Sequence, residues 1–399
     1  MPTRSGMGGR RPSIGAACRA AAFLSMGLFL AGTGLASGYS RPIPAQQAQS
    51  KPVRHYGRIN AFGPTNSAER AAFEEASAAG SLRTLPIWSR RFSIGNKPYS
   101  YTLVGGPPGL GGRTVVPTVI VPIRLTISDF SEDGRTPVVL DATEVVSHIL
   151  ASPLFQPSIA GGNRQFADAM LHAEFPKAPA HWRTTLSPSV AATLEVDVPP
   201  GAAKVFKSKS GKLLAVIEDG SVVNKPIAEA VKTSFSGSQL PIFVTYNALL
   251  RNAFGYHSFK FAQDKSEARV YIYSSWLEHV NDALGEPAPD AVTLSHEIAE
   301  VVHDPLLTSV TRYWGDAFNR NRCFDKLIEV GDAVEDAPFK IQYYRMPGML
   351  KGRQTVFTVQ TEALLPWFER QSPSKARHRA YSFPGEGALT APAPFNCKR

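Results

Sequence analysis

The segment over residues 288–305, APDAVTLSHEIAEVVHDP, holds three ionisable side chains at close spacing: His296, Glu297 and Glu300. Its apolar residues recur at the spacing of a helix rather than a strand, and Asp290 is in position to cap that helix. Side chains four positions apart lie one above the other on a helix. We therefore expect His296 and Glu300 to face the same side and to hold one metal ion.

Glu297 is adjacent to the first predicted ligand. In zinc hydrolases with the motif H-E-x-x-H, the glutamate at this position takes a proton from a metal-bound water. Here Glu300 stands in the place of the second histidine, and a carboxylate is an ordinary zinc ligand. The surrounding residues are largely apolar, so three ionisable groups among them would be costly to bury without a shared cation. The motif therefore predicts zinc, with Glu297 as the catalytic base.

A catalytic zinc site usually has three protein ligands and one open position, so a third ligand must come from elsewhere in the chain. Glu329 and Asp332, in the segment LIEVGDAVED, are acids that follow an apolar pair. His303 competes with them, because it falls on nearly the same helical face as His296. Asp304 is expected to form the C-terminal turn of the helix or to accept a hydrogen bond that orients His296.

Two further residues are considered as donors to a developing oxyanion: His257 in GYHS and Tyr313 in TRYWGD. Ordinary packing is the alternative for both. The strand predicted over residues 268–276, ARVYIYSSW, precedes the metal-binding helix and could be the edge along which an extended peptide pairs. Its aromatic residues equally suit a core.

These residues resemble the zincin metallopeptidases, which share a helix with metal ligands at this spacing. They are more closely similar to a group of secreted bacterial proteins in which S-H-E-x-x-E-x-x-x-D-P is followed by E-[VI]-G-D, here SHEIAEVVHDP and EVGD. The segments TVVPTVIVPIRLTI, NRQFADAMLHAEF, NAFGYHS and LLPWF also occur in the order found in that group. The resemblance implies a zincin-like core in which Glu297 is the base and zinc is bound by His296, Glu300 and Glu329.

The elements that must position these residues are mixed in order. From Tyr101, YTLVGG and TVVPTVIVPIRLTI are typical of a hairpin-like pair of strands. Helices are expected over residues 141–150 and 163–175, and the strands AATLEVDV, KLLAVIE, PIFVTYN and ARVYIYSS precede the metal-binding helix. This order predicts an α+β fold, namely a zincin-like domain with a mixed sheet and a metal-binding active-site helix.

The N-terminus is typical of an export signal. Four arginines, an apolar run and a short stretch of small residues predict a removable signal peptide over residues 1–38. Residues 39–95, rich at first in Pro, Gln and Ser, are predicted to be a linker or pro-segment, and residues 96–399 the zincin-like catalytic domain. Because the apolar run is short for a membrane span, we expect a secreted or periplasmic protein with no stable membrane insertion after cleavage.

Charge and cysteine content narrow the function classes further. Without the four arginines of the signal, 39 basic residues stand against 33 acidic ones, and this mild excess without a run of five like charges disfavours nucleic acid as a partner. Two cysteines remain in the mature chain, Cys323 and Cys397. In an oxidising compartment we expect them to form a disulfide, with two unrelated thiols as the alternative.

Taken as a whole, the sequence predicts a secreted zinc-dependent hydrolase, and among hydrolases it favours a metallopeptidase with a peptide or protein substrate. The alternative is a non-catalytic extracellular binding or cell-surface protein on the same scaffold, in which the metal is structural or absent. An open coordination position would favour the enzyme, whereas a closed four-ligand site would favour the alternative.

Overall fold

The computed structural model of the chain describes residues 41–42, 82–159, 163–284, 288–315, 317, 326–335, 337–343 and 355–394. Residues Tyr39–Arg399 form one compact unit. The predicted signal peptide, the greater part of the predicted linker, and both Cys323 and Cys397 lie outside the described residues. No helix within those ranges is long and apolar enough to cross a membrane.

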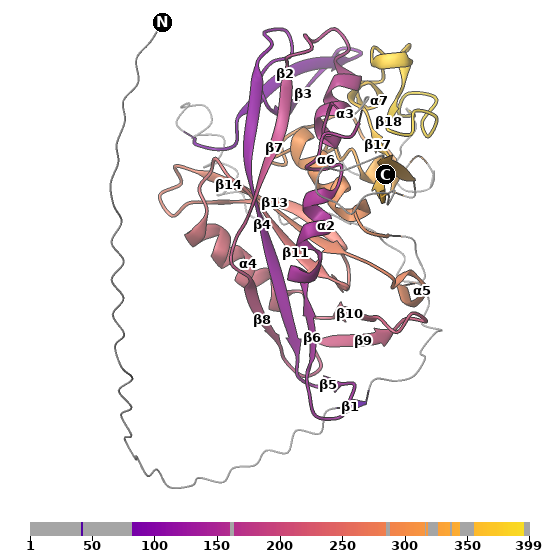
Figure 1. Ribbon diagram of the computed structural model, residues 1–399. Coiled ribbons are helices and arrows are strands. Elements are labelled where there is room, and N and C mark those ends of the chain that lie inside the picture. The colour runs from indigo at the N-terminus through magenta and orange to yellow at the C-terminus, as the bar shows by residue number, and fades with distance from the viewer. Residues whose placement is uncertain are drawn as a thin grey trace, which may run out of the picture. The chain divides into compact units, whose positions relative to one another are not determined.

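A seven-stranded mixed sheet lies at the centre of this unit (Figure 1). The order β13-β14-β11-β4-β6 runs across it, and β7 and β8 also pair with the long strand β4. The seven strands are β4 (Arg113–Ile127), β6 (Val138–Asp141), β7 (Arg183–Val190), β8 (Leu194–Val198), β11 (Leu240–Tyr246), β13 (Gly255–Phe261) and β14 (Ala268–Trp276).

Strand β14 is internal, which corrects the prediction that residues 268–276 form an edge. It pairs in parallel with β11, in the register Ile242↔Ile272, and antiparallel with β13, in the register His257↔Ile272. Strand β13 is therefore the end strand of the sheet on this side. The aromatic residues of β14 are buried in the core, as their alternative interpretation had it.

Helices cover both faces of the sheet, because the side chains of a strand point alternately to either side. In β11, Ile242 and Val244 join the core beneath α2, α3 and α6, whereas Phe243 joins the core beneath α4 (Figure 1). The helices are α2 (Val146–Ala151), which follows the short 3-10 turn η1 (Ala142–Val145), α3 (Phe166–Glu174), α4 (Ser221–Ser234) and α6 (Val292–His303). The helices predicted over 141–150, 163–175 and 288–305 are confirmed.

A hairpin precedes the sheet, and its strands are not the pair that the sequence predicted. Strand β3 (Lys97–Val104) pairs antiparallel with β2 (Ile87–Ile94), not with β4, because Gly95, with φ of 60°, and Asn96 close a two-residue turn between them. Strand β2 lies within the segment predicted as a linker, so regular structure begins before residue 96.

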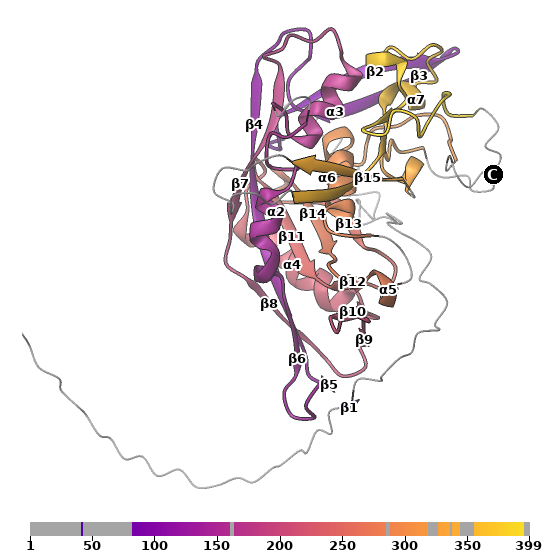
Figure 2. The same cartoon turned by 45° about the vertical axis from the view of Figure 1, so that its right-hand side comes forward.

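Smaller elements complete the unit, and some of them lie against α6. Helix α6 contacts β3, β13, β14 and β16, and Figure 2 shows β15 and β16 in front of it. The α+β class with a mixed sheet is confirmed. The remaining elements are β1 (Arg41–Pro42), β5 (Phe130–Ser131), β9 (Ala203–Lys207), β10 (Leu213–Ile217), β12 (Ala248–Leu250), β15 (Pro338–Tyr343), β16 (Thr355–Gln360), β17 (Glu362–Ala363), β18 (Ser382–Phe383), α5 (Asn281–Leu284), α7 (Leu365–Phe368), η2 (Asp332–Val334) and η3 (Arg377–Arg379).

Candidate metal centre

Helix α6 is buried along its whole length, from Val292 to His303. The residue that caps it is Ala291, one position later than predicted; the Asp290 carboxylate instead accepts hydrogen bonds from the backbone N–H groups of Ala291 and Thr358. A helix buried on all sides offers its polar side chains no bulk water, so each of them needs a partner inside the protein.

His296 has one ring nitrogen fixed and the other facing acids. Gln360 donates from its amide nitrogen to the Gly331 carbonyl at 2.7 Å, so its amide oxygen, 3.1 Å from His296 Nδ1, accepts a hydrogen bond from that nitrogen. This leaves Nε2 without a proton in the neutral ring. It lies 3.1 Å from Glu300 Oε1 and 3.6 Å from Asp332 Oδ1. A lone pair facing two carboxylates requires a proton or a metal ion between them.

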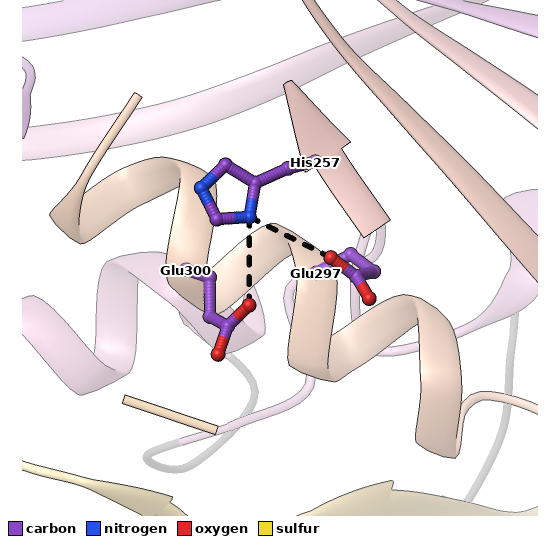
Figure 3. Close-up of side chains that lie close together, drawn as sticks. All are labelled: His257, Glu297 and Glu300. Carbon is purple, nitrogen blue, oxygen red and sulfur yellow. Dashed lines mark ion pairs between the residues drawn. The ribbon is translucent and has the colours of Figure 1, made fainter. Parts of the chain in front are cut away.

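His257 repeats this arrangement from strand β13 and is fully buried. Its Nε2 donates to the backbone carbonyl of Asp304 at 3.2 Å. Its Nδ1 therefore points with a lone pair toward Glu300 Oε2 at 3.4 Å and Glu297 Oε2 at 3.7 Å (Figure 3). The sequence suggested His257 as an oxyanion donor, but its ring lies beside two carboxylates, in the position of a metal ligand.

Several carboxylate oxygens around the two histidines accept no hydrogen bond, although they are buried. In the described parts of the chain, no lysine or arginine forms an ion pair with these acids. Removing carboxylates from water without partners costs several kcal/mol each, so a bound cation is the partner that would offset the cost. The oxygens without a hydrogen bond are Glu300 Oε2, Asp332 Oδ1, and both carboxylate oxygens of each of Glu297, Glu329 and Glu362.

The electrostatics of the cluster point the same way. Burial raises the pKa of Glu329, Asp332 and Glu362 well above the usual range, and neighbouring Glu300 raises that of Glu329 and Asp332 further. Burial acts in the same direction on Glu300, but His296 and His257 outweigh it and lower its pKa to about 2. Glu300 is thus the acid that the surroundings hold in its charged form.

The same carboxylates act on the two histidines. Burial lowers their pKa, but Glu297 and Glu300 outweigh it and raise the pKa of both His257 and His296 well above the ordinary value. The cluster therefore attracts positive charge, which a metal ion can supply in place of the two protons.

Two glycines let backbone approach the cluster closely. A Cβ atom on Gly331 would lie 2.4 Å from His296 Nδ1, and one on Gly255 would lie 2.6 Å from Glu297 Oε1. Both distances are far below ordinary contact, so any larger residue would displace the side chain opposite. The glycine in the sequence E-V-G-D is thus required by the packing of His296.

The structure gathers most of the predicted metal ligands and gives three other predicted residues, His303, Asp304 and Tyr313, different partners. In each of two groups the ligand atoms lie within 4.8 Å of one another: His296, Glu300 and Asp332 in one, and His257, Glu297 and Glu300 in the other. Glu329 is buried near enough to Glu300 for that charge to raise its pKa, but it belongs to neither close group.

His303 and Asp304 have other partners. His303 donates through Nδ1 to the Ala299 carbonyl at 2.7 Å and through Nε2 to Glu174 at 2.9 Å, so neither nitrogen is left for a metal. The Asp304 carboxylate accepts from the N–H groups of Thr308 and Ser309, and it is the Asp304 carbonyl that orients a histidine, His257 rather than His296.

Tyr313 lies half-buried beyond α6, with the Lys326 ammonium 4.7 Å from its ring centroid. Gln360 and Glu362 are members of the site that the sequence did not suggest. They lie two positions apart in the strand-like segment TVFTVQTE, and both are buried. Residues two apart in a strand point to the same face, so this pair of polar residues was the feature of the sequence that could have indicated them.

The described structure thus shows a buried group of histidines and acids, centred on α6, that could hold a metal ion. Comparisons of the chain with protein-family models, with curated proteins and with solved structures found no match.

Proposed function

We propose that this chain is a metal-dependent hydrolase, with zinc as the ion and a peptide or protein as the substrate. One observation carries the proposal. His296 presents Nε2 to Glu300 and Asp332, while Glu297 follows it directly on the same buried helix. One imidazole and two carboxylates, with another carboxylate beside them, form a donor set that suits zinc, and three protein ligands leave one of its four coordination positions for water.

The chemistry of such a site divides between ion and protein. A bound zinc ion lowers the pKa of a coordinated water toward neutrality. Glu297 would accept the proton from that water and pass it to the leaving group. Neither of its carboxylate oxygens accepts a hydrogen bond, and burial raises its pKa, so its basicity is greater than that of an exposed glutamate.

A peptide substrate and an extracellular place of action rest on the sequence. The resemblance to zincin metallopeptidases favours cleavage of peptides, and the N-terminal charge and apolar run favour export to the periplasm or the medium. Nothing in the charge pattern favours nucleic acid. The expected disulfide between Cys323 and Cys397 would suit the same oxidising compartment.

Glu297→Gln tests the proposal. The variant should retain the ion at His296 and lose at least about 100-fold in the rate of peptide hydrolysis, because the amide does not accept the proton. Glu229→Gln, which makes the same change at an exposed position of α4, is the control and should leave the rate unchanged. Undiminished hydrolysis by Glu297→Gln would reject Glu297 as the base.

A second function is favoured by how deeply the cluster lies. His257 and Glu300 are 0% exposed and His296 is 4% exposed, which also suits a structural ion in a non-catalytic binding or cell-surface protein. X-ray absorption on the zinc-loaded protein separates the two. A coordination shell that includes a water oxygen supports the hydrolase, whereas a shell filled by protein ligands supports the structural ion.

A further inference from the structure

We propose that the cluster holds two divalent cations bridged by Glu300, one bound by His296 and Asp332 and the other by His257 and Glu297. The proposal rests on the metal-dependent function above and adds a second ion to it. It follows from the placement of two imidazoles on opposite sides of one carboxylate.

The two oxygens of Glu300 face different histidines. Oε1 lies 3.1 Å from His296 Nε2 and also accepts a hydrogen bond from the Gly331 N–H at 3.3 Å. Oε2 lies 3.4 Å from His257 Nδ1 and accepts no hydrogen bond. A carboxylate that directs each oxygen to a separate imidazole lone pair is arranged to bridge two ions, as in two-metal hydrolytic sites.

Each histidine is oriented independently. The Asp304 carbonyl holds Nε2 of His257, and the Gln360 amide holds Nδ1 of His296. Metal-binding histidines in proteins commonly have their second nitrogen fixed in this way by an acceptor. Because the two rings come from different elements and have different acceptors, each forms the start of its own site.

Each group also has a second acid of its own. Asp332 Oδ1 lies 3.6 Å from His296 Nε2, and Glu297 Oε2 lies 3.7 Å from His257 Nδ1. Neither of these oxygens accepts a hydrogen bond. Each ion would therefore have one imidazole nitrogen, one Glu300 oxygen and one oxygen of a second acid. On the His257 side this third oxygen is Glu297 Oε2, so Oε1 is the oxygen left to act as the base.

The charge of the cluster favours two ions over one. One divalent cation would balance two buried carboxylates, whereas two would balance four. The available acids are Glu297, Glu300, Glu329, Asp332 and Glu362, each at most 4% exposed. Mixed imidazole and carboxylate ligands suit zinc, manganese or iron rather than calcium.

Metal content measured by elemental mass spectrometry tests the proposal. The protein, saturated with Zn²⁺ and then freed of excess by gel filtration, should retain two zinc ions per chain. His257→Ala and His296→Ala should each retain one, and the double variant none. His148→Ala, which removes an exposed histidine outside the cluster, should retain two zinc ions. One zinc ion per chain in the unmodified protein would overturn the proposal.

Electron paramagnetic resonance of the unmodified protein loaded with Mn²⁺ tests the bridge itself, and does so even if a variant fails to fold. Two ions that share Glu300 should give an exchange-coupled multiline spectrum. Two ions that give only the six-line spectrum of isolated Mn²⁺ would reject the bridge.

The two proposals fail in different ways. Two bound ions without peptide hydrolysis would keep the two-ion site and reject the hydrolase. Hydrolysis with one bound ion, lost in Glu297→Gln, would keep the hydrolase and reject the second ion.

Discussion

The two ends of α6 bury the same kinds of side chain with different outcomes. At its C-terminal end, His303 donates from both ring nitrogens, and its partner Glu174 accepts from His303 with one oxygen and from the Leu365 N–H with the other. Around His296, about two turns earlier, histidine nitrogens and carboxylate oxygens face one another, and several of these buried atoms have no hydrogen-bond partner.

The difference shows what a structural ion pair needs and what the candidate metal centre lacks. The pair of His303 and Glu174 is complete within the protein, since each polar atom has a partner. The cluster around Glu300 has more acids than its two histidines can neutralise. A buried histidine beside a glutamate is therefore no sign of a metal by itself, whereas unused acceptors around it are.

Of the changes that test this difference between the two ends of α6, removal of bound metal should have the largest effect on stability. Chelation of the metal-loaded protein should lower the free energy of unfolding by about 5 kcal/mol or more, because several buried carboxylates lose their partner at once. Calorimetry before and after dialysis against a chelator measures it.

The His257→Ala, His296→Ala double variant is the control, since its unfolding should not respond to the chelator. An unchanged melting temperature in the unmodified protein, with metal loss verified by elemental analysis, would show that the acids are stable without a cation.

Glu174→Gln removes the ion pair between Glu174 and His303 at the C-terminal end of α6. We expect a loss of about 3 kcal/mol in the free energy of unfolding at pH 6, because His303 is left buried without its counter-charge. Metal content should stay the same. Chemical denaturation together with elemental analysis measures both.

The effect of Glu174→Gln should also depend on pH. Burial lowers the pKa of His303, but Glu174 outweighs it and the net pKa is raised above 6.5. The stabilisation from the charged pair is therefore complete below pH 6.5 and is lost as pH rises through the raised pKa. The gap between variant and unmodified protein should shrink over that rise, and a gap independent of pH would mean that His303 is not charged in the folded protein.

Gln360→Ala should have the smallest effect, and on binding rather than folding. Losing the acceptor that fixes Nδ1 of His296 should weaken zinc binding about 10- to 100-fold. Competition with a fluorescent zinc chelator measures the change. Gln342→Ala, on the exposed side of the paired strand β15, should bind zinc as the unmodified protein does. Equal affinity of the two variants would count against His296 as a ligand.

The sequence predicted those elements whose signals are local. The apolar spacing around His296 located α6, and β-branched runs located β4, β11 and β14. Pairing is not local, so β3 was predicted to pair with β4 although its partner is β2, a strand within the segment predicted as a linker. The dipeptide Gly95-Asn96 was the one short-range sign of the true hairpin.

The site residues also divide into those that local spacing predicts and those that distant parts of the chain bring in. Spacing on one helix was enough to place His296 beside Glu300. It gave no means to bring His257 from the end strand, or Gln360 and Glu362 from the C-terminal segment, to the same point. For the same reason the helix spacing suggested His303, whose ring is engaged by Glu174 from a distant helix.

The residues of the centre come from four separate stretches of chain: strand β13, helix α6, the stretch around Gly331, and the stretch around Gln360. An ion bound there would act as a cross-link between them, made by coordination rather than by a covalent bond. Its uptake would close loops that the backbone alone leaves open. The metal supply would then determine how fast the C-terminal part acquires resistance to proteolysis during folding.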